Sequence, residues 1–138
     1  MHITARINNQ AGQHDVRLTT NDQSRTLTIP PKTTGFGSSA SGGELLFLAL
    51  ATCYCNDIYR EAEKRNIRVQ GVEVKVEGDF GALGEPADNV VYHACVMAHG
   101  DEEVIRSIMQ YTDQVAEIQN TLRRATPVTL ARRDIVSV

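Results

Sequence analysis

The three cysteines of this chain, Cys53, Cys55 and Cys95, are the side chains best suited to covalent chemistry. A cysteine acts as the thiolate, which attacks peroxides, exchanges disulfides or binds a metal. Cys53 follows the most apolar stretch of the sequence, and desolvation raises the pKa of a thiol there. Cys53 is therefore either a small core residue or a nucleophile whose activating charge comes from elsewhere in the fold or from a second subunit.

Cys55 is a poor partner for Cys53, because two residues along a helix correspond to a rotation of roughly 200°. The two sulfur atoms then point apart, so they form a disulfide only if the helix unwinds locally. They also diverge as metal ligands, and no set of His and Cys at the spacing of structural zinc sites accompanies them. We expect no metal and no cofactor. Cys95, beside His93, is a third thiol or a core residue.

Glu44 has two possible roles. It stands three residues after Ser41, just before an apolar run, which is the spacing of a helix capping box. A carboxylate at a helix N-terminus is also a stable anion that can orient a guanidinium group. The sequence has no GxGxxG, P-loop, HExxH or GxSxG motif, which excludes the common nucleotide-binding, zinc-protease and hydrolase sites.

The overall composition is that of a globular protein with nearly balanced charges. The chain of 138 residues has 14 Lys plus Arg against 17 Asp plus Glu, a net charge of -3. This balance offers no electrostatic footprint for nucleic acid or an anionic membrane. The apolar run at residues 45–52 is too short to cross a bilayer, and the N-terminus lacks the pattern of a signal peptide. We expect a cytoplasmic protein with reduced cysteines.

The elements that position these residues begin with strands. Short alternating runs in the first thirty residues, ending at Pro30, predict an antiparallel meander of three strands. A loop rich in Gly and Ser follows, to Gly43. A long helix then continues to Arg65. Its first half, residues 45–55, is apolar nearly all round and should be buried on every side, whereas its second half becomes amphipathic and polar. One thin sheet cannot cover the first half, so we expect a partner subunit to do so.

The second half of the chain predicts two more strands, a helix and a last strand. Alternation predicts strands at 69–80 and 90–99, with Gly71 marking a bulge. Asp101 can cap a helix whose apolar seam runs from Val104 to Leu122. Pro127 ends that helix, and residues 128–138 read as a final strand. The pairing of strands favours an α+β fold over a doubly wound sheet, in one domain covering residues 1–138.

The residues around Cys53 resemble the helix motif of the OsmC/Ohr family (osmotically induced and organic hydroperoxide resistance proteins). This motif is a Glu, Leu-rich residues and a small-residue run ending in Cys, here residues 42–53. Further similar segments are RNIRV at 65–69, GVEV at 71–74, IQNTL at 118–122 and TPV at 126–128. The resemblance covers roughly residues 38–130.

The resemblance implies an intertwined homodimer with antiparallel sheets and a long buried central helix. It also implies a thiol-dependent peroxidase that reduces organic hydroperoxides or hydrogen peroxide. Cys53 matches the peroxidatic cysteine, and Glu44 matches the carboxylate that orients an activating Arg. Arg17 is the best-placed residue for that Arg, although Gln13 or His14 can equally occupy its position.

The sequence departs from the family at the resolving cysteine, because Ala116 and Glu117 occupy its place. An external thiol or dithiol reductant, Cys95 or Cys55 would then have to replace it. The alternative is a non-catalytic dimer that keeps the fold and binds a small apolar ligand.

Overall fold

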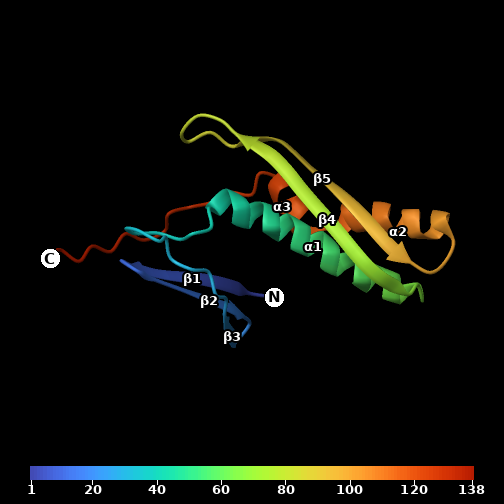
Figure 1. Cartoon of the computed structure of the whole chain (residues 1–138), viewed down its shortest axis with the longest axis horizontal. Coiled ribbons are helices and arrows are strands. Elements are labelled where there is room, and N and C mark those ends of the chain that lie inside the picture. Colours follow the sequence, from blue (N-terminus) through green and yellow to red (C-terminus); the bar gives the residue numbers. More distant parts are fainter. The chain divides into compact units, whose positions relative to one another are not determined.

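The computed structural model describes all residues 1–138 and has a mixed α+β fold with antiparallel sheets and three helices (Figure 1). The chain divides into two compact units, Met1–Leu46 and Phe47–Val138. No helix is both long enough and apolar enough to cross a membrane.

The first unit contains the predicted meander of three strands, β1 (Ile3–Gln10), β2 (Gln13–Thr20) and β3 (Gln23–Thr26), in the order β1-β2-β3. Tight turns join the strands, and each has a residue in the left-handed region, Gly12 (φ 72°) and Asn21 (φ 45°). The pairing sets Arg17 of β2 opposite Arg6 of β1. The prediction of an antiparallel meander is confirmed, with the third strand ending earlier than the sequence suggested.

Helix α1 (Gly42–Lys64) begins with the predicted capping box. The Ser41 N–H donates to Glu44 Oε1 at 3.0 Å, and the Glu44 N–H donates to Ser41 Oγ at 3.1 Å. These bonds satisfy two backbone N–H groups at the helix start that would otherwise have no hydrogen-bond partner. The helix ends at Lys64, and the left-handed conformation of Asn66 (φ 56°), two residues later, turns the chain toward the next strand.

The second unit is built on a hairpin of β4 (Val69–Phe80) and β5 (Ala87–Ala98), which crosses α1 (Figure 1). The register shifts between Val69 and Gly71, as expected for the predicted bulge. One face of the hairpin packs on a core formed by α1 and the helix that follows β5. The core residues are Tyr54, Ile58, Ala62 and Ile108, with Val72, Val74, Tyr92, Ala94 and Val96 of the hairpin against them.

Burial along α1 differs from the sequence prediction. In the apolar first half, Leu50 and Tyr54 are buried, but Leu48 is 59% exposed. The second half instead buries Ile58 and two carboxylates, Asp57 and Glu61. The hairpin and the following helices cover this half. The single chain does not bury the apolar half on every side, and its cover by a partner subunit remains a prediction.

Two predictions for the C-terminal region are wrong. The single helix expected up to Leu122 is broken at Ala116 into α2 (Glu102–Val115) and α3 (Glu117–Arg123). Its start is as predicted, with Asp101 Oδ1 accepting from the Glu103 and Val104 N–H groups. Residues 128–138 form no strand. Alternation alone does not make a strand, because a strand needs a neighbour for its backbone hydrogen bonds, and none pairs with this segment.

Candidate active site

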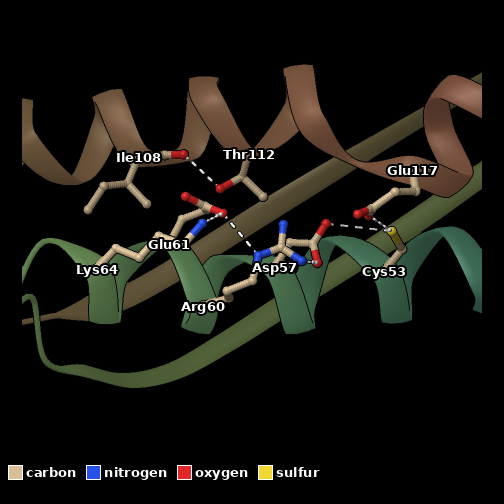
Figure 2. A network of polar contacts seen from close by, with 8 residues as sticks. All are labelled: Cys53, Asp57, Arg60, Glu61, Lys64, Ile108, Thr112 and Glu117. Atoms are coloured by element: carbon tan, nitrogen blue, oxygen red, sulfur yellow. Dashed lines mark hydrogen bonds and ion pairs between the residues drawn. The ribbon is translucent and has the colours of Figure 1, made fainter. Parts of the chain in front are cut away.

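Cys53 lies in the middle of α1, half-buried, beside two carboxylates (Figure 2). Its Sγ lies 3.7 Å from Asp57 Oδ2 and 3.9 Å from Glu117 Oε2, so the single thiol proton can be donated to either carboxylate. Asp57 stands one helical turn after Cys53, so the regular backbone of α1 itself places both side chains on one face. Glu117 comes from the other side, as the first residue of α3.

The break at Ala116 positions Glu117. Ala116 has an extended conformation (φ -67°, ψ 110°) and is fully buried. Side chains satisfy the carbonyl groups that the end of α2 leaves free: Asn120 Nδ2 donates to the Gln114 carbonyl at 3.0 Å, and Arg123 Nη1 donates to the Asp113 carbonyl at 2.9 Å. Because these side chains cap the end of α2, the helix can break at Ala116 even though the apolar pattern of the sequence continues past that residue.

The surroundings of Cys53 within the second unit disfavour its thiolate. Burial raises the pKa of the Cys53 thiol, and the negative charges of Asp57 and Glu117 raise it further. Hydrogen bonds from the backbone N–H groups of Ile118 and Glu117 act in the opposite direction. The charged groups beside the sulfur, Asp57 and Glu117, are both negative. It therefore remains a prediction that an activating positive charge comes from elsewhere in the fold or from a second subunit.

The guanidinium of Arg60, which contacts Asp57, binds carboxylates rather than sulfur. Arg60 Nη1 contacts Asp57 Oδ1 at 2.8 Å, and Arg60 Nε contacts Glu61 Oε1 at 3.0 Å. Lys64 Nζ also lies 2.9 Å from Glu61 Oε1. Burial raises the pKa of Asp57 although the Arg60 charge opposes it, whereas hydrogen bonds from Lys64 and Arg60 lower the pKa of Glu61. Asp57 is thus a more basic carboxylate than its neighbour one turn along.

Cys53, Asp57 and Glu117 could each offer one ligand atom to a cation, since these atoms lie within 4.8 Å of one another. The cysteine spacing in the sequence pointed only to the pair Cys53 and Cys55 as metal ligands and did not indicate this combination. The set contains no imidazole, and Arg60 already balances the charge of Asp57. Three such groups are one ligand short of a closed tetrahedral zinc site, and the contacts that join them in the structure are hydrogen bonds to the sulfur.

The remaining predicted site residues lie apart from this cluster or in the other unit. Glu44 has the capping role described above, which lowers its pKa through the hydrogen bonds from Ser41. Arg17 is exposed on β2 and takes part in none of the salt bridges, so the structure does not bring it to Glu44. Cys55 is half-buried on α1, and Cys95 is exposed on β5.

Cys95 projects away from the core of the second unit. Its neighbours Ala94 and Val96 pack against the core that contains Tyr54. Successive side chains of a strand point to opposite faces, so Cys95 is on the face of the hairpin that does not contact α1. It therefore cannot reach Cys53 within one chain unless the hairpin detaches.

Comparison with known proteins identifies the family. The model of the family described as OsmC-like protein matches residues 35–131, which include Cys53, Asp57 and Glu117. This chain belongs to the OsmC-like protein family. No curated protein sequence matches it significantly.

Two solved structures are similar to this OsmC-like protein in fold. One is an OsmC-like protein from Mycoplasma pneumoniae, with 18% identity, a TM-score of 0.58 and coverage of 87% of each chain. The other is an OsmC-like protein of unknown function from Vibrio cholerae, with 12% identity and a TM-score of 0.59, covering 88% of this chain and 93% of that one. At these identities the likeness establishes the fold alone.

Asp57 was not among the predicted site residues, and Glu117 was predicted only as a residue in the place of the missing cysteine. The spacing of four residues from Cys53 to Asp57 was a signal for the first. No pattern in the sequence indicated that the chain would break at Ala116 and bring Glu117 to the sulfur.

Proposed function

We propose that this OsmC-like protein is a thiol-dependent peroxidase that reduces organic hydroperoxides or hydrogen peroxide at Cys53. The family motif that ends at Cys53 supports this function. The observation that carries it is the half-buried Cys53 sulfur, which lies against carboxylates that can accept its proton and near the backbone N–H groups of Ile118 and Glu117.

The reaction forms one bond and breaks one. The Cys53 sulfur attacks an oxygen of the hydroperoxide, so that an S–O bond forms and the O–O bond breaks. The electron pair leaves with the second oxygen, which takes up the thiol proton and departs as an alcohol or water. The sulfur is oxidised by two electrons to a sulfenic acid, and the peroxide is reduced by two.

An external thiol or dithiol completes the cycle. Ala116 occupies the place of the family's second cysteine, and Cys95 is on the far face of the hairpin. Cys55 is two residues from Cys53 on the regular helix α1, so its sulfur points away from that of Cys53. A first external thiol condenses with the sulfenic acid and releases water, giving a mixed disulfide. A second thiol then exchanges with this disulfide and restores Cys53.

Arg17 and Glu44 are proposed to assist the thiolate. The family resemblance assigns a guanidinium near the peroxidatic sulfur and a carboxylate that orients it. Such a cation would oppose the rise in pKa that burial, Asp57 and Glu117 cause at Cys53. Arg17 is exposed and free of salt bridges, and is therefore available for this role.

We also propose a homodimer, supported by the apolar half of α1. Leu48 lies in this half and is 59% exposed in the single chain, within a run of residues that would otherwise be expected in a core. A second copy of the chain laid on this part of α1 would bury it. The dimer is the expected state of the family fold.

A second candidate function is the non-catalytic binding of a small apolar ligand. The raised pKa of Cys53 and the absence of a cysteine at position 116 favour it. The second unit offers an open groove of about 630 Å³, whose apolar side is formed by Tyr54, Tyr92, Ala94 and Met109. This volume is in the range of small-molecule sites.

The two functions are separated by the rate of oxidation of Cys53. Stopped-flow measurement with cumene hydroperoxide, followed by trapping of the sulfenic acid and mass spectrometry, should show Cys53 reacting about 100-fold faster than the exposed Cys95. Cys53→Ser should abolish turnover with a dithiol, and the matched variant Cys95→Ser should retain it. A Cys53 that reacts no faster than Cys95 overturns the peroxidase and favours the ligand-binding protein.

A further inference from the structure

The Cys53 thiol proton has a defined acceptor. Asp57 Oδ2 lies 3.7 Å from Sγ, while Asp57 Oδ1 is held by Arg60 at 2.8 Å (Figure 2). The side chain therefore presents one oxygen to the guanidinium and the other to the sulfur. Because Asp57 is 5% exposed and belongs to the same helix turn as Cys53, little freedom remains for it to turn away.

Glu117 is placed differently. It is exposed at the start of α3, with Oε2 at 3.9 Å from Sγ, and it also shares a side-chain hydrogen bond with Asp57. The negative charge of Glu117 and this hydrogen bond both raise the pKa of Asp57. Asp57 and Glu117 are the charged side chains that face the sulfur within the second unit, and Arg60 faces Asp57 from α1.

A thiol in these surroundings needs a base. Burial and the two negative charges raise the pKa of Cys53, so an attack by the free thiolate is disfavoured at neutral pH. Burial also raises the pKa of Asp57, which makes it a stronger base than an exposed aspartate. A carboxylate so placed can take the proton during the attack, and need not wait for the thiol to ionise first.

We infer that Asp57 is a catalytic acid–base residue, which accepts the Cys53 thiol proton and passes it to the leaving oxygen of the hydroperoxide. The inference rests on the proposed function. As the S–O bond forms, the proton moves from Sγ to Asp57 Oδ2. As the O–O bond breaks, the proton moves to the alkoxide or hydroxide, so the products are the sulfenic acid and an alcohol or water, and Asp57 is again a carboxylate. Glu117 supplies the second negative charge that keeps Asp57 basic.

The variant Asp57→Asn separates this role from a purely electrostatic one. Removal of the negative charge should make the thiolate form more easily, so the pH midpoint of alkylation by iodoacetamide should move down. Iodide leaves without a proton, whereas the peroxide oxygen requires one. We therefore expect the rate with cumene hydroperoxide at pH 7 to fall by about 100-fold while alkylation at the same pH becomes faster.

Glu61→Gln is the matched control, because Glu61 is buried one turn further along and binds the same Arg60 but does not contact the sulfur. Its rate with hydroperoxide should stay near that of the wild type. If Asp57→Asn speeds both reactions, Asp57 acts through its charge alone and the inference is overturned while the peroxidase stands. If the wild type itself does not react with hydroperoxide, the proposed function and this inference both fall.

A measurement on the wild type keeps the inference falsifiable if Asp57→Asn does not fold, which circular dichroism will show. Oxidation of Cys53 by cumene hydroperoxide should be slower in D2O than in H2O at equivalent pH, since a proton moves in the step. Alkylation measured in parallel corrects for the isotope effect on thiol ionisation. Equal solvent effects on the two reactions would contradict proton transfer by Asp57.

Discussion

The Cys53 thiol donates a hydrogen bond to Asp57, which stands one turn later on the same face of α1, with 3.7 Å between Sγ and Oδ2. This contact depends on the regularity of one helix and on no distant packing. The same helix that holds the proposed peroxidatic sulfur thus also places a carboxylate beside it. The tertiary structure then adds a second carboxylate, from Glu117, and raises the pKa of the thiol further.

Neutralising Glu117 should make Cys53 ionise at lower pH. Glu117 raises the pKa of the thiol, so Glu117→Gln should lower that pKa and shift the curve of alkylation rate against pH toward lower pH. At pH 7, below the midpoint, alkylation of Cys53 should be faster than in the wild type. The control is Glu102→Gln, an exposed acid on α2 that lies beside Arg106. An unchanged curve for Glu117→Gln would mean that the Glu117 charge does not raise the pKa of the Cys53 thiol.

Removing the proposed guanidinium should slow the peroxidase. If Arg17 stabilises the thiolate, Arg17→Ala should raise the midpoint of the pH–rate curve and lower the rate with cumene hydroperoxide at pH 7 by about 10- to 100-fold. Arg6→Ala is a matched control, since Arg6 is the cross-strand partner of Arg17 in the β1–β2 register. Equal rates for the two variants would exclude Arg17 and direct attention to Gln13 and His14.

A cysteine at position 116 should restore an internal disulfide. The family resemblance puts Ala116 where other members have a second cysteine, and Ala116 precedes Glu117, which contacts the Cys53 sulfur. After one equivalent of hydroperoxide, Ala116→Cys should yield a disulfide between positions 53 and 116, detected by mass spectrometry of unreduced peptides. Because Ala116 is fully buried, the larger side chain should cost about 1–3 kcal/mol of stability. Persistence of the sulfenic acid in this variant would show that the two positions do not meet.

A charge on the apolar half of α1 should dissociate the proposed dimer. Leu48→Glu places a carboxylate on a surface that we expect a second copy to bury, where an unpaired charge is strongly unfavourable. Light scattering coupled to size-exclusion chromatography should give a dimer for the wild type and a monomer for the variant. Leu83→Glu, in the exposed loop between β4 and β5, should leave the mass unchanged. A wild-type chain that is a folded monomer would refute the dimer.

The contacts of Asp113 should make stability depend on pH. Burial raises the pKa of Asp113, but hydrogen bonds from Tyr92 and Arg123 outweigh it and hold that pKa below its ordinary value. A lowered folded-state pKa stabilises the protein above the unfolded-state value of about 4, and this stability is lost as the pH falls through the folded-state value.

Tyr92→Phe tests this arrangement. It should lower the free energy of unfolding by about 1–2 kcal/mol at pH 7, measured by urea denaturation. The deficit relative to the wild type should shrink as Asp113 becomes protonated at low pH. Tyr59→Phe is the control, because Tyr59 is 43% exposed on the surface of α1. A deficit that is the same at pH 7 and at low pH would show that the Tyr92 hydroxyl does not act through the Asp113 charge.

Local signals in the sequence determined much of the fold. The capping box of Ser41 and Glu44, the Asp101 cap and the bulge near Gly71 each depend on a few neighbouring residues, and the structure has all of them. The α+β class and the family follow from the same kind of information, since strand alternation and the residues that lead to Cys53 are written in consecutive positions.

Tertiary structure decided the features that depend on contacts between residues far apart in the sequence. The apolar seam predicted one helix through Ala116, but side chains from α3 cap the end of α2 and allow the break. Residues 128–138 alternate like a strand, yet a strand exists only where another edge accepts its hydrogen bonds. The charge beside the Cys53 sulfur was also decided by tertiary structure, because it depends on which residues the fold brings there. Here the fold brings Glu117, which is 64 positions away in the sequence.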